Sequence, residues 1–242
     1  MMFRSLRHIC ALVAIVALSV VTVSASGFSF SSSNLVAGPA GSTSVTSDLH
    51  RIADEGSEED AVAAATETAI ATFASGCFWC TEADFDKIPG VLKTVSGFTG
   101  GTTENPTYKQ VVRGGTGHTE ALEITYDPTK VTYKELLAHF WKNVDPFDLT
   151  GQFCDRGDSY RPAIFAHSAE QKALAEASRA ELNASGKFKK KIELPILDAG
   201  AFTAAAEYHQ NFYKKNPWHY YRYRNGCARD ARLAEIWGKE GS

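Results

Sequence analysis

The sequence predicts an α+β domain, a ferredoxin-like α/β sandwich with an irregular C-terminal tail. Three observations support this fold class. Short apolar runs that favour strands are interspersed with amphipathic segments that favour helices. Two strands follow one another without a helix between them, which a strictly alternating parallel sheet does not allow. The chain has 242 residues, enough for one medium domain with extensions.

Local signals place each element. The strands are short apolar or alternating runs that end at glycine, proline or aspartate. Two helices begin with the capping pattern of Thr132-x-x-Glu135 and Ser168-x-x-Gln171, in which side chains bind free backbone N–H groups. The expected elements are, in order, a strand at 69–74, a helix at 78–87, strands at 91–98 and 120–126, a helix at 132–144, a strand at 163–166, a helix at 169–184, a strand at 192–197 and a helix at 204–215.

The N-terminal segment is typical of an export signal. Arg4 and Arg7 precede an apolar run at 9–23, and Val23-Ser24-Ala25 resembles a cleavage site. We therefore expect residues 1–25 to be a signal peptide that is removed, with the bacterial periplasm as the destination. The alternative is a retained N-terminal membrane anchor, but the run is shorter than the roughly 20 residues of a spanning helix.

Residues 26–67 are rich in Ser, Gly, Ala and Thr and lack periodic apolar residues. Such a composition buries too little apolar surface to offset chain entropy, so this segment is predicted to be a flexible linker. The catalytic domain is then expected at 68–242.

Composition excludes several classes of protein. Hydrophobic residues make up 44% and charged residues 22% of the chain, which is ordinary globular usage. The formal charge of -3 offers no basic excess for nucleic acid. Five cysteines are too few for a disulfide-dense scaffold, and Cys10 lies in the signal, so four cysteines carry any thiol chemistry.

The segment Gly76-Cys77-Phe78-Trp79-Cys80 lies where a strand meets a helix. Free N–H groups and the helix dipole favour a thiolate at a helix start, so Cys77 is the candidate nucleophile. Acidic residues at 82, 84 and 86 oppose a thiolate if they point toward it, so the sequence leaves the direction of the net shift in the pKa of Cys77 open.

Three further segments carry candidate site residues. Tyr108 is a hydrogen-bond donor, and Glu120 opens a strand where a shielded carboxyl group gains a raised pKa and acts as a proton donor. The polar loop at 152–162 holds Asp155 and Tyr160, which suit a polar rim around a small ligand. Tyrosines and arginines at 218–227 suit a docked covering segment, with Asn225-Gly226 as a flexible turn that presents Cys227.

These blocks together resemble the A-type peptide methionine-sulfoxide reductases over about 69–237. The matching segments are Gly76-Cys77-Phe78-Trp79, Asn105-Pro106-Thr107-Tyr108, Gly117-His118-Thr119-Glu120, Asp155 with Gly157 and Tyr160-Arg161, and Glu207-Tyr208-His209-Gln210 before Asn216-Pro217. Several ordered blocks in one chain are far more specific than any single block.

The resemblance implies a reaction and its residues. Cys77 attacks the sulfur of methionine S-sulfoxide, free or in protein, and Glu120 protonates the oxygen with help from Tyr108 and Tyr160. Cys77 becomes a sulfenic acid, the oxidation state above a thiol. Phe78 and Trp79 would bind the substrate's methyl group and Asp155 would organise the polar side. The resemblance implies no metal or nucleotide, and a thioredoxin-like dithiol as the partner that restores the enzyme. We expect a monomer by default.

The resolving cysteine departs from the commonest family pattern. Many relatives have glycine at position 80, and many have a cysteine at position 221, where this chain has tyrosine. Cys227 on the tail is placed slightly ahead of Cys80, which is one helical turn from Cys77, and Cys154 follows. A relay through more than one of them is a further option.

Two rival functions stay open. Cys77 and Cys80 also suit a thiol-disulfide oxidoreductase, but that function leaves Glu120 and the tyrosines without a role. A structural zinc site would combine Cys77 and Cys80 with two of Cys154, Cys227, His118 or His219, but the second close pair of ligands is missing.

Overall fold

The structure, a computed structural model, describes residues 67–238 of the chain. The expected signal peptide, almost all of the expected linker and residues 239–242 lie outside the described residues. Within 67–238, no helix has both the length and the apolar character needed to cross a membrane.

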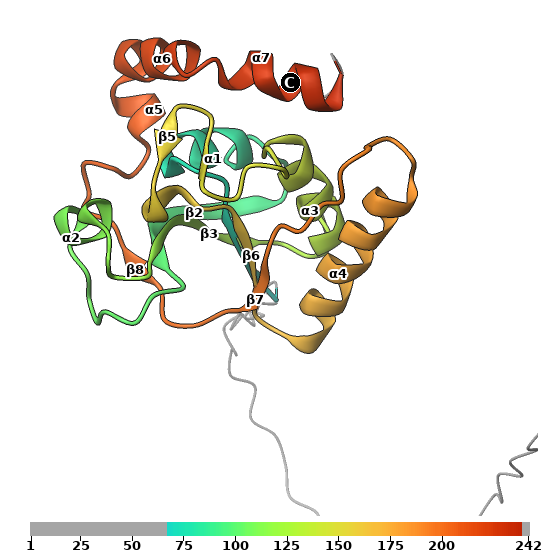
Figure 1. Cartoon of the computed structure of the whole chain (residues 1–242). Coiled ribbons are helices and arrows are strands. Elements are labelled where there is room, and N and C mark those ends of the chain that lie inside the picture. The colour runs from blue at the N-terminus through green and yellow to red at the C-terminus, as the bar shows by residue number, and fades with distance from the viewer. Residues whose placement is uncertain (1–66, 239–242) are drawn as a thin grey trace, which may run out of the picture. The chain divides into compact units, whose positions relative to one another are not determined.

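A six-stranded sheet with the order β7-β6-β1-β3-β2-β8 forms the centre of the domain (Figure 1). All neighbours pair antiparallel except β6 and β7, which are parallel. The strands are β1 (Ala69–Ala74), β2 (Val91–Thr99), β3 (Thr119–Tyr126), β6 (Ala163–Ala166), β7 (Ile196–Asp198) and β8 (Thr203–Ala204), while β4 (Gly151–Gln152) and β5 (Asp155–Arg156) pair separately. The antiparallel order β6-β1-β3-β2, with helices after β1 and β3, confirms the ferredoxin-like prediction.

Seven α-helices and one 3-10 helix are present in residues 67–238. They are α1 (Phe78–Phe85), α2 (Tyr108–Arg113), α3 (Tyr133–Lys142), α4 (Ala169–Ala184), the 3-10 helix η1 (Asp158–Tyr160), α5 (Phe212–Lys215), α6 (Pro217–Gly226) and α7 (Arg229–Trp237). The helices expected at 78–87, 132–144 and 169–184 are therefore present within a few residues of their predicted ends.

The main core lies between the sheet and helices α1 and α3. Phe73 of β1 stacks between Phe85 of α1 and Phe140 of α3, with ring centroids 5.3 and 5.0 Å away. Leu136 of α3 and Ile124 of β3 join this cluster and are fully buried. The apolar residues that predicted strands and helices therefore point to one shared core.

The capping patterns form in two different ways. Thr132 and Glu135 make the full reciprocal box at the start of α3. At α4 the Ser168 hydroxyl accepts from the Gln171 N–H at 3.1 Å, but the Gln171 side chain binds the His167 N–H instead of that of Ser168. A third box, Thr107 with Gln110, starts α2, a helix that was not predicted from the sequence.

The prediction of an irregular C-terminal tail was wrong. The C-terminal helices α5 to α7 cover α1, as Figure 1 shows, and Asn225-Gly226 lies inside α6 rather than in a flexible turn. Pro217 at the first turn of α6 suits a helix start because that position needs no N–H donor. Arg224 of α6 pairs with Asp84 of α1 at 2.8 Å, so the tail folds on partners that are distant in sequence.

The last two predicted elements were also misplaced. The helix expected at 204–215 is instead the end of strand β8, a loop and the short α5. Within the loop, the Gln210 side chain bonds the backbone of Ser96 and Ala205, next to the pairing of β8 with β2. The strand expected at 192–197 is reduced to β7 at 196–198.

The burial of Leu136 on α3 and the exposure of Leu92 on β2 predict that truncating these two leucines changes the stability by different amounts. Leu136→Ala should lower the free energy of unfolding by about 2–5 kcal/mol, because Leu136 is fully buried and truncation leaves a cavity. Leu92→Ala, at a side chain that is 53% exposed, should cost less than about 1 kcal/mol. Urea unfolding measures both, and equal losses would contradict this description of the core.

Candidate active site

The turn between β1 and α1 places Cys77 at the start of a helix. Gly76 has φ +86°, and a Cβ there would lie 2.5 Å from the Cβ of Gln152, so glycine is required twice over. Cys77 is the N-cap of α1, and its carbonyl accepts the N–H of Cys80 and of Thr81. The strand-to-helix turn predicted at Cys77 is therefore confirmed.

Cys77 and Cys80 are both free thiols, 6% and 2% exposed, and the Cys80 N–H donates to the Cys77 carbonyl at 3.1 Å. Burial, with Cys80 and Glu120 nearby, raises the pKa of Cys77. The hydrogen bond from Cys77 lowers the pKa of Cys80, and so do Arg229 and Arg224. In this buried pair, Cys77 holds the proton and Cys80 is the better placed thiolate. Burial, Cys80 and Glu120, rather than the acidic residues of α1, oppose the Cys77 thiolate.

Glu120 lies beside the thiol pair at the beginning of β3. It is 1% exposed, and its Oε2 accepts the backbone N–H of Phe78 at 3.0 Å. Burial raises the pKa of Glu120 to about 8, and Asp155 and Cys80 add to the shift. A carboxyl group in this environment is protonated at neutral pH and can act as a proton donor.

Two tyrosines complete this side of the site. Tyr108 opens α2 and Tyr160 ends η1. Burial raises the pKa of Tyr108 to about 12, with Glu120 and Cys77 adding to the shift, and burial raises the pKa of Tyr160 as well. Both hydroxyls therefore keep their protons and remain donors.

The two aromatic residues after Cys77 line an apolar region. Phe78 packs with Phe98 and is almost fully buried. Trp79 stacks on Phe212 of α5 with ring centroids 3.7 Å apart, and its Nε1 donates to His209 Nδ1 at 3.1 Å. Burial lowers the pKa of His209 to about 4, so this histidine is neutral. Its hydrogen bond to Trp79 was not anticipated from the sequence.

Asp155 lies on β5 and faces α6. Its Oδ2 accepts the Tyr223 hydroxyl at 2.5 Å, and burial raises its pKa. The Tyr223 hydroxyl also lowers the pKa of the Cys77 thiol. The cluster of tyrosines at 218–227 was noticed in the sequence, but nothing there distinguished Tyr223 from its neighbours.

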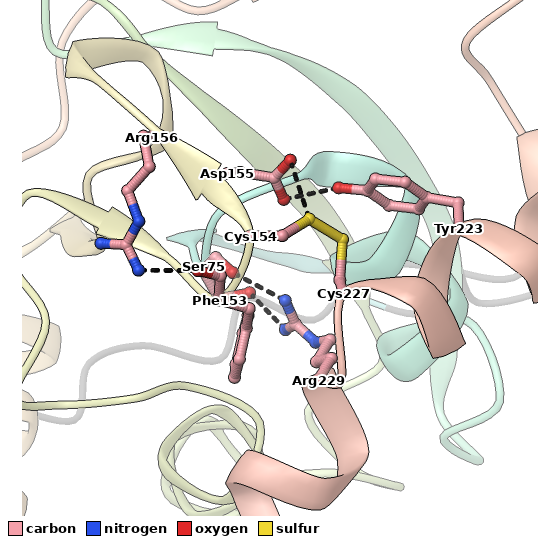
Figure 2. Close-up of a disulfide and its surroundings, with 8 residues drawn as sticks. All are labelled: Ser75, Phe153, Cys154, Asp155, Arg156, Tyr223, Cys227 and Arg229. Atoms are coloured by element: carbon pink, nitrogen blue, oxygen red, sulfur yellow. Dashed lines mark hydrogen bonds between the residues drawn. A yellow bond between two sulfur atoms is a disulfide. The ribbon is translucent and has the colours of Figure 1, made fainter.

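Cys154 and Cys227 form a disulfide beside this site (Figure 2). Their Cα atoms are 4.8 Å apart, and the bridge joins the β4–β5 hairpin to the end of α6. Cys227 therefore does not swing on a flexible tail. Six residues were considered for a zinc site. Of these, Cys77 and Cys80 lie together, while Cys154 and Cys227 are bonded to each other.

Arg229 anchors the chain that follows the disulfide. It is 2% exposed, donates to the Ser75 and Asn143 carbonyl oxygens at 3.1 and 2.7 Å, and lies 4.4 Å from the centre of the Phe153 ring. Figure 2 shows it beneath the disulfide. This buried arginine supplies positive charge to Cys80 and was not singled out from the sequence.

The fold and site together define a class of protein: a ferredoxin-like thiol oxidoreductase with a buried cysteine at a helix start and a protonated carboxyl beside it. The comparisons with known proteins identify the family. The family described as "Peptide methionine sulfoxide reductase" matches residues 69–241. This chain therefore belongs to the peptide methionine sulfoxide reductase family and is an oxidoreductase that reduces methionine sulfoxide.

Individual relatives agree with this assignment. The chain is 56% identical over 169 residues to "Peptide methionine sulfoxide reductase MsrA" of Bacillus subtilis, covering 70% of this chain and 96% of that protein. The protein of the same name from Listeria welshimeri is 55% identical over 167 residues, covering 69% and 94%.

Solved structures are similar as well. Mxr1 from Saccharomyces cerevisiae in reduced form is 32% identical with a TM-score of 0.58, covering 63% of this chain and 87% of that chain. Methionine sulfoxide reductase A of Corynebacterium diphtheriae is 36% identical with a TM-score of 0.54, covering 62% and 76%.

The raised pKa of Glu120 predicts a pH-dependent effect on stability. Between its ordinary value of 4.5 and about 8, the folded chain holds a proton that the unfolded chain releases, so this group makes stability fall as pH rises. Glu120→Gln removes that dependence and should gain on the order of 3 kcal/mol relative to wild type between pH 5 and pH 8. Urea unfolding of both proteins at pH 5 and pH 8 measures this gain. If the variant and the wild type differ in free energy of unfolding by the same amount at both pH values, Glu120 is not protonated in the folded chain.

Proposed function

We propose that Cys77 is the nucleophile and Glu120 the proton donor in the reduction of the S epimer of methionine sulfoxide, peptide-bound or free. The observation that carries this proposal is the pairing of a buried thiol at the start of α1 with a protonated carboxyl bonded to the next backbone N–H. The first turn of α1 thereby holds the nucleophile and, through the Phe78 N–H, the carboxyl group of Glu120 from β3.

The chemistry follows from these positions. The sulfur of Cys77 gives an electron pair to the sulfoxide sulfur, while Glu120 protonates the sulfoxide oxygen. Together with the proton released by the thiol, the oxygen leaves as water. Water then attacks the Cys77 sulfur and methionine departs, which returns a proton to Glu120 and leaves a sulfenic acid. The sulfoxide is reduced by two electrons and Cys77 is oxidised by two.

The remaining residues orient the substrate. Tyr108 and Tyr160 keep their hydroxyl protons and suit donation to the sulfoxide oxygen. Phe78 and Trp79 form an apolar wall suited to the methyl group of the substrate. Asp155 organises the polar side opposite. The proposed reaction uses no metal or nucleotide.

We propose Cys80 as the resolving cysteine. It is in contact with Cys77, and Arg229 and Arg224 favour its thiolate. Its attack on the sulfenic sulfur of Cys77 forms a disulfide and releases water with a proton from Glu120. Cys227, placed ahead of Cys80 from the sequence, is instead bonded to Cys154. A thioredoxin-like dithiol then reduces the new disulfide, and a monomer suffices because all these groups come from one chain.

Cysteine variants test this assignment with the separate epimers of a methionine-sulfoxide peptide. Cys77→Ser should abolish reduction of the S epimer with any reductant. Cys80→Ser should retain turnover with dithiothreitol, which reduces a sulfenic acid directly, but lose at least about 10-fold with thioredoxin. The double variant Cys154→Ser, Cys227→Ser should still turn over with thioredoxin.

Two results would overturn parts of the assignment. Loss of thioredoxin-supported turnover in the double variant, with Cys80→Ser intact, would make the tail pair the resolving cysteines. Reduction of protein disulfides without reduction of either epimer would instead support the thiol-disulfide oxidoreductase.

We also propose that the chain is exported and loses residues 1–25. The charged start, apolar run and small residues at 23–25 support this proposal. Mass spectrometry of the protein purified from the periplasm of a bacterial host should find Ser26 as the first residue. An intact N-terminus in the membrane fraction would support the retained anchor.

A further inference from the structure

Glu82 is a fully buried carboxyl group on α1 to which the proposed function gives no role. It follows Trp79 by three residues, so both side chains lie on neighbouring turns of one helix face. Its Oε2 accepts the Asn211 N–H at 2.8 Å, and its Oε1 has no hydrogen-bond partner among the described residues. Burying a carboxyl group for a single hydrogen bond costs free energy, so the position of Glu82 calls for an explanation.

The hydrogen bond of Glu82 reaches the residue that directly precedes Phe212. Asn211 has φ +53° and is the N-cap of α5, although its side chain makes no capping hydrogen bond. The left-handed conformation is unfavourable for most residues other than glycine, so the buried acceptor stabilises a turn that local interactions hold weakly. This turn determines where the Phe212 ring lies, and that ring stacks on Trp79 with centroids 3.7 Å and planes 8° apart.

Trp79 is held by both ends of the segment 209–212. Phe212 covers one face of the indole, and His209 Nδ1 accepts from the indole Nε1 at 3.1 Å. Because both contacts come from outside α1, the orientation of the indole depends on where this segment lies. The bond to Glu82 falls between these two contacts in the sequence and attaches the segment to the helix that carries Trp79.

We propose that Glu82 is a positioning residue that fixes the segment 209–212 and, through it, the orientation of the Trp79 indole against the methyl group of the substrate. The inference rests on the proposed function, in which Trp79 is part of the apolar wall. A wall that contacts the methyl group binds substrate and transition state alike, so loosening it raises KM more than it lowers kcat. A loosened wall also discriminates less against a larger alkyl group.

The test compares Glu82→Ala with Glu82→Gln in the full chain. Burial raises the pKa of Glu82 to about 7, so a neutral amide is a close substitute at neutral pH, and its oxygen can accept the Asn211 N–H. With dithiothreitol and the S epimer of a methionine-sulfoxide peptide, Glu82→Ala should raise KM by about 5- to 10-fold and change kcat by less than about 2-fold. Glu82→Gln should restore both constants to within about 2-fold of the wild type.

A second readout compares two substrates that differ by one methylene group. The ratio of kcat/KM for methionine sulfoxide to kcat/KM for ethionine sulfoxide does not depend on the fraction of enzyme that is folded. Glu82→Ala should lower this ratio by about 3-fold or more. Leu136→Ala is the matched control, because Leu136 is equally buried but belongs to a different apolar cluster from Trp79, and it should leave the ratio unchanged.

Deuterium exchange of the Trp79 indole N–H, followed by NMR, tests the positioning without any turnover. The Trp79→Phe variant assigns the signal. The hydrogen bond to His209 protects this proton in the folded chain, so its exchange should be at least about 10-fold faster in Glu82→Ala and unchanged in Glu82→Gln.

The outcomes separate this inference from the proposed function. Unchanged indole exchange in Glu82→Ala, or a Glu82→Gln variant as impaired as Glu82→Ala, would overturn the positioning role even in a working reductase. Faster exchange with an unchanged KM and substrate ratio would also overturn it, because the indole would then not select the substrate. If the wild type reduced neither epimer, the proposed function would fail, and the exchange rates would still decide whether Glu82 positions Trp79.

Discussion

The buried guanidinium of Arg229 is the interaction on which the arrangement of this domain depends. It joins the end of β1 at Ser75, the end of α3 at Asn143 and the ring of Phe153 next to the disulfide. A guanidinium with almost no exposure needs hydrogen-bond acceptors and a nearby negative charge; both terminal nitrogens of Arg229 donate to acceptors, and Asp84 lies 3.7 Å away. Removing this side chain would leave Asp84 buried with Arg224 alone. The position of α7, and through it of α6, is therefore coupled to the helix that carries the thiols.

Closure by the C-terminal helices determines the electrostatics of the site. Because α5 and α6 cover α1, Cys77 and Glu120 lie in a region with little water, where charged forms are disfavoured. The same helices bring Arg224, which pairs with Asp84 and Asp230, toward Cys80. The docked helices thus dehydrate both cysteines and place positive charge beside Cys80. The two thiols of one motif differ in character because they face different neighbours.

Local rules explain why the first part of the domain was predictable. The strand-to-helix turn at Gly76, the capping box at Thr132 and the buried run at 69–74 depend on residues within a few positions of one another. The position of Glu120 followed from its place at the beginning of a strand. The C-terminal helices were not predictable in this way, because their stability comes from Arg224 and Arg229 meeting residues over 80 positions away. The roles of His209 and Tyr223 likewise depend on partners that only the folded chain brings together.

Dehydration has opposite consequences for the two groups that react. It favours the reaction at Glu120, because a raised pKa keeps the acid protonated until the sulfoxide oxygen takes the proton. It opposes the reaction at Cys77, because the thiolate is the nucleophile and burial raises its pKa. Exposing the site would help the thiol and deprotonate the acid, so exposure cannot resolve the conflict. The groups that favour the Cys77 thiolate act on that thiol alone: Cys77 is the N-cap of α1, where the helix dipole favours negative charge, and the Tyr223 hydroxyl lowers the pKa of Cys77.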